Sequence, residues 1–128
     1  MKYLLDTRPF LLWDSDSGKL PKQVVDLIRS QDSEIFVSLA SMREIQIKSQ
    51  LGMLDLPAPI TQIFQRQQDE NCITMLAIGF SLTLMLTKLP NYHHDPFDRL
   101  IIAQALVDDM TIITNDPLIT QYEVKTFW

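Results

Sequence analysis

The chain has 128 residues, 46% of them hydrophobic and 21% charged, which suits one domain with an apolar core and argues against a disordered chain. Its single cysteine, Cys72, excludes a disulfide framework within the chain and fits a reducing compartment. The net charge of −5 argues against a surface that attracts nucleic acid on all sides, but it suits a site crowded with carboxylates.

The apolar segments are too short for membrane insertion. Asp6 interrupts the apolar run at the N-terminus, so we expect no secretory signal peptide and a cytoplasmic location. The longest uncharged stretch, residues 72–87, falls short of the roughly 20 residues that a membrane span needs. We expect this stretch to form a buried strand followed by a buried helix.

Short apolar runs and helix-start signals alternate along the first half of the chain. In chain order they predict a strand at residues 2–5, a turn or short helix at 10–13, a helix from Pro21 through Ile28, a strand at 35–39 and a helix from Ser41 to Leu51. The start of this last helix reads Ser41-Met42-Arg43-Glu44, which is a capping-box pattern, and Gly52 follows it as a stop signal.

The second half continues in the same way after a break marked by two prolines. It predicts a helix at residues 60–70, a strand at 73–76, a helix at 81–89, a helix at 95–107, a strand at 111–114, a short helix opened by Pro117 and a strand at 124–127. The strands are continuous apolar runs, which is typical of strands buried on both faces. The sequence therefore predicts an α/β fold with a mostly parallel sheet between helices, in one domain over residues 1–128.

Acidic residues fall just beyond the ends of the predicted strands. Asp6 ends the first strand, Glu44 lies in the first turn of the helix after the second, and Asp116 follows the fourth. Asp95 and Asp98 open the long helix at residues 95–107. Because parallel α/β sheets bind ligands beyond the carboxyl ends of their strands, we expect these acids to meet at one edge of the sheet.

Most of these acids also have a local explanation. Asp95 and Asp116 each precede a proline in the pattern of a helix N-cap, and Glu44 completes the capping box. Asp98 is expected in the first turn of its helix, where the helix dipole favours a carboxylate. Asp6 caps no obvious regular helix, so its structural explanation is the weakest.

Taken together, the acids indicate a metal site. Converging carboxylates without matching cations repel one another, which raises their pKa values, and a divalent cation removes that penalty. All-oxygen ligands suit Mg²⁺ or Mn²⁺, which activate water and neutralise charge on a phosphoryl group. We therefore expect metal-assisted phosphodiester hydrolysis. His93 and His94 lie in the loop before the long helix, where hydrogen bonding near Asp95 or Asp98 is favoured over metal binding.

Four segments of the chain resemble proteins of the PIN-domain family, above all the VapC-type toxins of bacterial toxin–antitoxin pairs. They are LLDT at residues 4–7, SLASMREIQIKSQLGML at 38–54, HHDPFDRLIIAQA at 93–105 and IITND at 112–116. The resemblance covers nearly the whole chain, and its most specific part is DPFDRLIIAQA. It implies a three-layer α/β/α sandwich, a Mg²⁺- or Mn²⁺-dependent endoribonuclease, a cognate antitoxin and a homodimer.

The resemblance also assigns roles to individual residues. It implies a catalytic role for Asp6, Glu44, Asp98 and Asp116. Three of these acids are the expected metal ligands, namely Asp6, Asp98 and Asp116, while Glu44 orients or helps to deprotonate the attacking water, or joins a second metal. The expected accessory residues are Thr7, Asp95 and Thr114.

Three basic residues are candidate contacts for the phosphates of the RNA, namely Arg8, Lys48 and Arg99. Lys48 lies four residues after Glu44, so an ordinary ion pair on one helix face is the simpler interpretation. Many relatives carry Asn or His at the position of Arg8. An arginine there can touch substrate phosphate, or it can weaken metal binding, so the alternative function is a catalytically weak or inactive PIN-like interaction domain.

Overall fold

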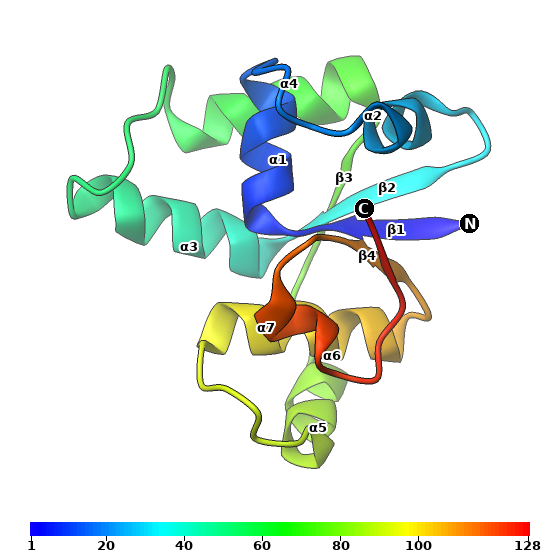
Figure 1. Cartoon of the computed structure of the whole chain (residues 1–128). Helices are drawn as coiled ribbons and strands as arrows, with labels where there is room; N and C mark the ends of the chain where they lie inside the picture. The colour runs from blue at the N-terminus through cyan, green and yellow to red at the C-terminus, as the bar shows by residue number, and fades with distance from the viewer.

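The computed structural model describes residues 1–128 and has one five-stranded sheet at its centre (Figure 1). The strands are β1 (Lys2–Leu5), β2 (Glu34–Ser38), β3 (Thr74–Leu76), β4 (Thr111–Ile113) and β5 (Thr126–Phe127). They lie in the order β3-β2-β1-β4-β5, and every neighbouring pair is parallel. The five predicted strands are therefore confirmed, with ends that differ by at most two residues. The expectation that the strand within residues 72–87 is buried is wrong, because β3 lies at the edge of the sheet and is only partly buried.

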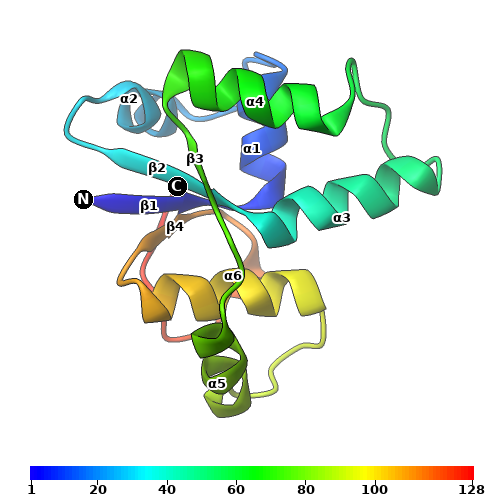
Figure 2. The ribbon, with the colours of Figure 1, turned by 180° about the vertical axis from the view of Figure 1, so that it is seen from behind.

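Seven helices connect the strands and cover both faces of the sheet. They are α1 (Thr7–Asp14), α2 (Lys22–Arg29), α3 (Leu39–Gln50), α4 (Ile60–Asn71), α5 (Phe80–Lys88), α6 (Pro96–Val107) and α7 (Pro117–Thr120). Helices α1, α2 and α4 lie on one side of the sheet and α5, α6 and α7 on the other, as Figure 1 and the reverse view in Figure 2 show. The fold is the expected three-layer α/β/α sandwich.

Two apolar cores, one on each side of the sheet, hold the layers together. Along β1, Leu4 belongs to the core beneath α6, and the next residue, Leu5, belongs to the core beneath α1, α2 and α4. Ile112 and Ile113 of β4 divide in the same way. Successive side chains of a strand point to opposite faces, so a strand between two helical layers must be apolar at every position.

The first residues of α1 and α3 correct two predictions. Asp6 is the N-cap of α1, and its Oδ1 accepts a hydrogen bond of 2.8 Å from the backbone N–H of Thr7. Helix α3 begins at Leu39 with Ser38 as its N-cap, so Glu44 lies in the second turn and no capping box forms. The Oγ of Ser38 takes the capping role by accepting from the N–H of Ala40 at 3.0 Å, which carries the helix straight on from the last residue of β2.

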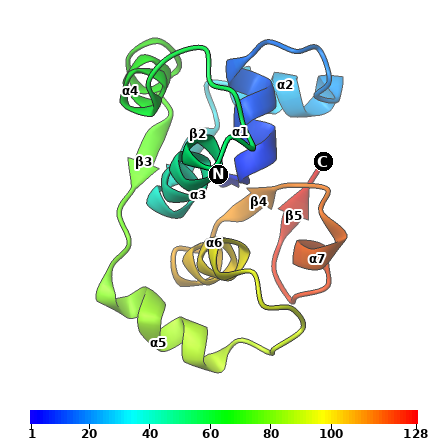
Figure 3. The ribbon, with the colours of Figure 1, turned by 90° about the vertical axis from the view of Figure 1, so that its left-hand side faces the viewer.

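Helix α5 corrects a third prediction, because most of its surface is not buried. Leu82 is 3% exposed, but Phe80 and Leu84 are 78% and 56% exposed. The helix contacts α6 and lies apart from the sheet, with α6 between them (Figure 3), so only one of its sides is covered. No helix of the structure has the length and apolar character that crossing a membrane requires.

Candidate active site

The candidate site lies where the direction of the strand order reverses. The chain builds β1, β2 and β3 outward on one side and then returns to place β4 on the other side of β1. In the register of the sheet Leu5 pairs with Val37 on one side and with Ile113 on the other. The residues that follow these positions therefore emerge together, at the kind of crevice where open α/β sheets bind ligands.

A pocket of about 480 Å³ opens at this edge and collects the acids that the sequence singled out. Its acidic lining residues are Asp6, Glu44, Asp95, Asp98 and Asp116. Arg8 and Lys48 line it as well, and its apolar residues include Met53 and Leu118. Pockets of similar size elsewhere contain at most two acids each, so chemistry rather than volume distinguishes this one.

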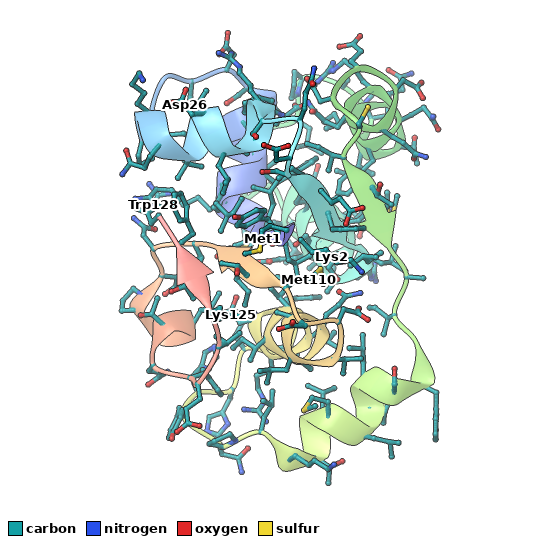
Figure 4. The ribbon with its side chains drawn as sticks, turned by 90° about the vertical axis from the view of Figure 1, so that its right-hand side faces the viewer. Met1, Lys2, Asp26, Met110, Lys125 and Trp128 are labelled. Carbon is teal, nitrogen blue, oxygen red and sulfur yellow. The ribbon has the colours of Figure 1, made fainter.

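The opposite end of the sheet has a different character. Figure 4 views that end, where Met1, Lys2 and Met110 lie near the amino ends of β1 and β4. Lys125 lies there too and forms an exposed ion pair with Asp109 at 2.7 Å. The charges of such a pair cancel, whereas the acidic residues at the carboxyl ends of the strands outnumber the basic residues beside them.

Asp6 is buried and held by hydrogen bonds to both of its carboxylate oxygens. Oδ1 accepts from the N–H of Thr7, and Oδ2 accepts from the hydroxyl of Thr114 at 2.9 Å. Thr114 Oγ1 in turn accepts from the N–H of Asp116 at 3.1 Å. Thr114 thereby connects the acid after β1 to the acid after β4.

Glu44 reaches the pocket from α3 because of where that helix begins. The side chains of Ser41 and Glu44 are three residues apart and share the helix face that meets α1. Thr7 Oγ1 lies 2.7 Å from Glu44 Oε1 and 2.9 Å from Ser41 Oγ. The other oxygen of Glu44 pairs with Lys48 Nζ at 2.7 Å, which is the i,i+4 ion pair that the sequence favoured.

Asp95 and Asp98 divide two tasks at the start of α6. Oδ1 of Asp95 accepts from the N–H groups of Phe97 and Asp98 at 2.9 and 3.0 Å, so Asp95 is the helix N-cap. Asp98 is buried in the first turn, and its Oδ2 lies 3.1 Å from His93 Nε2. Asp116 caps α7 in the same manner as Asp95, by accepting from the N–H of Leu118 at 2.9 Å.

The electrostatics of the pocket are those of an acidic cluster that its two basic lining residues, Arg8 and Lys48, compensate only in part. Burial is the largest cause that raises the pKa of Asp6, followed among the raising causes by the charges of Glu44 and Asp116. Burial also raises the pKa of Asp98 to about 6, although the hydrogen bond from His93 lowers it, and the charges of Asp95, Asp6 and Asp116 add to the increase. Four chain segments therefore place negative charge within range of one another.

The donor set suits a hard divalent cation, although the side chains do not surround one. No group of three or more His, Cys, Asp and Glu side chains is arranged so that it could hold a metal ion together. Each carboxylate is hydrogen-bonded to donors of its own chain, while Asp98 Oδ1 and Asp116 Oδ2 accept no hydrogen bond. Carboxylates that repel one another and keep such oxygens free fit Mg²⁺ or Mn²⁺ by their chemistry.

The remaining predicted residues do not all reach the pocket. Arg8 is exposed at its rim and forms no ion pair. Arg99, a candidate substrate contact, lies outside the lining, because its Nη1 donates to Pro90 O at 2.8 Å and to the hydroxyl of Tyr122 at 3.0 Å. No local sequence pattern points to Tyr122 or to the role of Ser41, since both depend on contacts between distant segments.

The comparisons with known proteins come from a family model and from solved structures. Residues 3–125 match the model of the PIN domain, and no curated protein matches the sequence. The chain is similar to VapBC2 from Rickettsia felis, solved bound to a DNA fragment from their promoter, with a TM-score of 0.75, 13% identity and coverage of 99% of this chain and 98% of that chain.

Two further structures have the same fold. VapBC-1 from nontypeable Haemophilus influenzae gives a TM-score of 0.60 at 19% identity, over 99% of this chain and 97% of that chain. FitAcB from Neisseria gonorrhoeae gives 0.63 at 16% identity, over 98% of this chain and 96% of that chain. At these identities the similarity is one of fold alone.

Proposed function

The chain belongs to the PIN-domain family, whose members are generally nucleases, and from this we propose that it is a metal-dependent endoribonuclease that acts as the toxin of a toxin–antitoxin pair. The single observation that carries the proposal is the convergence of Asp6, Glu44, Asp98 and Asp116 from four segments into one pocket. Residues 1–128 then form one catalytic domain, which acts on RNA phosphodiester bonds.

The acids divide into metal-holding and water-directing residues. Asp6, Asp98 and Asp116 would hold Mg²⁺ or Mn²⁺, which when bound stabilises charge on the scissile phosphate and lowers the pKa of water. Glu44 is the acid that orients the attacking water or takes its proton. Thr7 and Lys48 each hydrogen-bond one of its oxygens, so its carboxylate is held in a fixed orientation at the pocket. The hydroxyl groups of Thr7 and Thr114 keep Glu44 and Asp6 in place, and Asp95 holds the start of the helix that carries Asp98.

Two cations at the pocket are suited to guide the RNA. Arg8 is free of ion pairs and exposed, so its guanidinium can bind a phosphate beside the scissile one. Lys48 is engaged by Glu44, the largest cause that raises its pKa, and the charges of Asp95 and Asp98 add to the increase. We assign the first substrate contact to Arg8. Lys48 is the second, and it leaves Glu44 when it binds an incoming phosphate.

The proposed partners follow from the family and from the similar structures, several of which are VapBC complexes. We propose a cognate antitoxin that silences the nuclease by covering the acidic pocket, and a homodimer as the assembly. The apolar residues Met53 and Leu118, which are 68% and 48% exposed beside the acids, offer a surface for that cover.

Two observations favour a second candidate, a catalytically weak or inactive PIN-like interaction domain. The carboxylates do not surround a metal position as they stand, and Arg8 brings a positive charge to the rim of the site. In this alternative the fold and the antitoxin-binding surface persist without cleavage.

The deciding experiment is cleavage of total cellular RNA by antitoxin-free protein, read by sequencing the new 5′ ends. The reactions contain Mg²⁺ or a chelator, and they compare wild type with Asp98→Asn and with Asp26→Asn. Asp26 lies on α2 near the opposite end of the molecule and is exposed (Figure 4), so the same chemical change there is a matched control. We expect discrete cuts from wild type and Asp26→Asn with Mg²⁺ only, and a loss of at least about 100-fold in the cutting rate of Asp98→Asn.

The alternative makes a different prediction for the same reactions. Folded wild-type protein that cuts no RNA with Mg²⁺ or Mn²⁺ contradicts the nuclease assignment and favours the interaction domain. Equal cutting by Asp98→Asn and wild type contradicts the assignment of the site while leaving the activity in place.

A further inference from the structure

A partly buried chain of hydrogen bonds leads from Arg99 through Tyr122 and His93 to Asp98. His93 Nε2 lies 3.1 Å from Asp98 Oδ2, and His93 Nδ1 lies 2.8 Å from the hydroxyl of Tyr122. Arg99 Nη1 donates to the same hydroxyl at 3.0 Å. The side chain of His93 is 9% exposed, so this histidine is a buried polar group that the proposed cleavage does not itself use.

The donor and acceptor of each hydrogen bond follow from the chemistry of Arg99, which has no acceptor atom. Arg99 can only donate, so the oxygen of Tyr122 accepts from it and turns its single proton toward His93 Nδ1. Nδ1 is then the acceptor of the imidazole, and Nε2 carries the proton. That proton points to Asp98 Oδ2, which leaves Oδ1 of the same carboxylate without a hydrogen bond.

The chain of hydrogen bonds also connects two of the site's acids. Tyr122 follows α7, whose N-cap is Asp116, and its N–H donates to Ile119 O at 3.1 Å. Arg99 belongs to α6 and ties the loop before that helix by its bond to Pro90 O. The rings of Tyr122 and His93 meet edge to face with centroids 5.4 Å apart. This chain of hydrogen bonds, which we call the relay, therefore sets the position of α7 against α6, and with it the position of Asp116 against Asp98.

From this geometry we propose that His93 is a positioning residue, locked by Tyr122 and Arg99, which turns Asp98 so that its free oxygen faces the cation site. The proposal deepens the function proposed above and rests on it for the catalytic consequence. The locked imidazole itself is independent of any activity. Partners of this kind, outside the ligands themselves, typically alter metal affinity or activity by about 10- to 100-fold.

The first test reads the imidazole directly by ¹⁵N NMR of histidine-labelled protein, with chelator present at pH 8. We expect His93 to show a bare Nδ1 and a slowly exchanging proton on Nε2, whose signal shifts in Asp98→Asn. His94 is exposed and makes no hydrogen bond, so it supplies the freely exchanging reference within the same sample. A protonated Nδ1 on His93, or exchange as fast as that of His94, overturns the proposal.

The second test measures Mn²⁺ affinity by electron paramagnetic resonance in the absence of RNA. We expect His93→Ala to weaken Mn²⁺ binding by about 10- to 100-fold. His93→Gln should restore most of the affinity, since the amide N–H group of Gln can donate to Asp98 in place of Nε2. His94→Ala should bind as wild type does. In cleavage assays the His93→Ala loss should appear in kcat, with KM nearly unchanged.

The outcomes separate this proposal from the proposed function. Equal Mn²⁺ affinity in wild type and His93→Ala overturns the positioning role, and so does a loss in His93→Gln as large as in His93→Ala, because that marks simple packing. Loss of affinity in His93→Ala from a wild type that cuts no RNA supports the positioning role and contradicts the nuclease. Should wild type bind no Mn²⁺, the proposed cation site fails, and the positioning role of His93 toward that site is overturned with it.

Discussion

At the residue scale, the site is built from carboxylates whose charge the folded chain accommodates poorly. Asp6 and Asp98 are buried, and the pKa of each is raised first by burial and further by the neighbouring acids. Hydrogen bonds from Thr114 and His93 lower these values but do not cancel the increase. A site that attracts a cation therefore costs stability while the cation is absent.

This cost predicts how stability depends on pH when chelator is present. The pKa of Asp98 is about 6 in the folded protein against an ordinary value of 3.8, so folding favours the protonated acid. Its contribution to stability is present below pH about 4 and is lost as pH rises through about 6. Asp98→Asn should therefore exceed wild type in free energy of unfolding by about 1–3 kcal/mol at pH 8, with the difference shrinking toward pH 4.

Urea unfolding at several pH values checks this prediction. Asp26→Asn serves as the control, because an exposed carboxylate should change stability by no more than about 0.5 kcal/mol. An Asp98→Asn protein less stable than wild type at pH 8 would contradict the account of the buried charge.

At the scale of elements, α5 shows how little of an apolar helix needs to be covered. It packs on α6 along one side only, and Leu82 is its buried residue. The exposed Phe80 and Leu84 belong to the same helix and have comparable apolar character. Position on the helix, rather than residue type, then decides which side chain stabilises the fold.

The contrast between these leucines can be measured within one helix. Leu82→Ala removes a side chain from the core beside α6 and should lower the free energy of unfolding by about 2–5 kcal/mol. Leu84→Ala removes the same atoms from an exposed position and should change it by less than about 1 kcal/mol. Thermal unfolding of both variants is the measurement, and similar losses in the two would show that α5 is covered on both sides in solution.

At the scale of the whole molecule, the pocket couples cation binding to folding, because its acids come from segments that only the folded chain brings together. A cation held by Asp6, Asp98 and Asp116 binds the native state and not the unfolded chain, so it stabilises the former by mass action. Mg²⁺ at about 100 times its Kd should add about 2.7 kcal/mol, or roughly 5–10 °C in the melting temperature.

Calorimetry with and without Mg²⁺ tests this coupling. The increase should persist in Asp26→Asn and disappear in Asp98→Asn and in Asp6→Asn. An equal increase in all four proteins would show that Mg²⁺ acts on the general surface charge of −5 and not on the pocket.

The sequence by itself determined the elements and the edge of the sheet where the acids gather. Continuous apolar runs predict the parallel strands, and the Asp-Pro starts of α6 and α7 predict N-caps, because these signals act within about one turn of chain. Because ligands of parallel α/β sheets bind beyond the strand ends, this pattern was enough to predict that Asp6, Asp98 and Asp116 lie close together.

Only the tertiary structure decided what depends on contacts between distant segments. It set the start of α3 at Leu39, which turns Glu44 toward Thr7, and it left most of α5 exposed. It also placed Tyr122 against His93, which lies 29 residues earlier in the chain. No local pattern encodes such a pair, since its partners meet only when α6 and α7 have packed on the same face of the sheet.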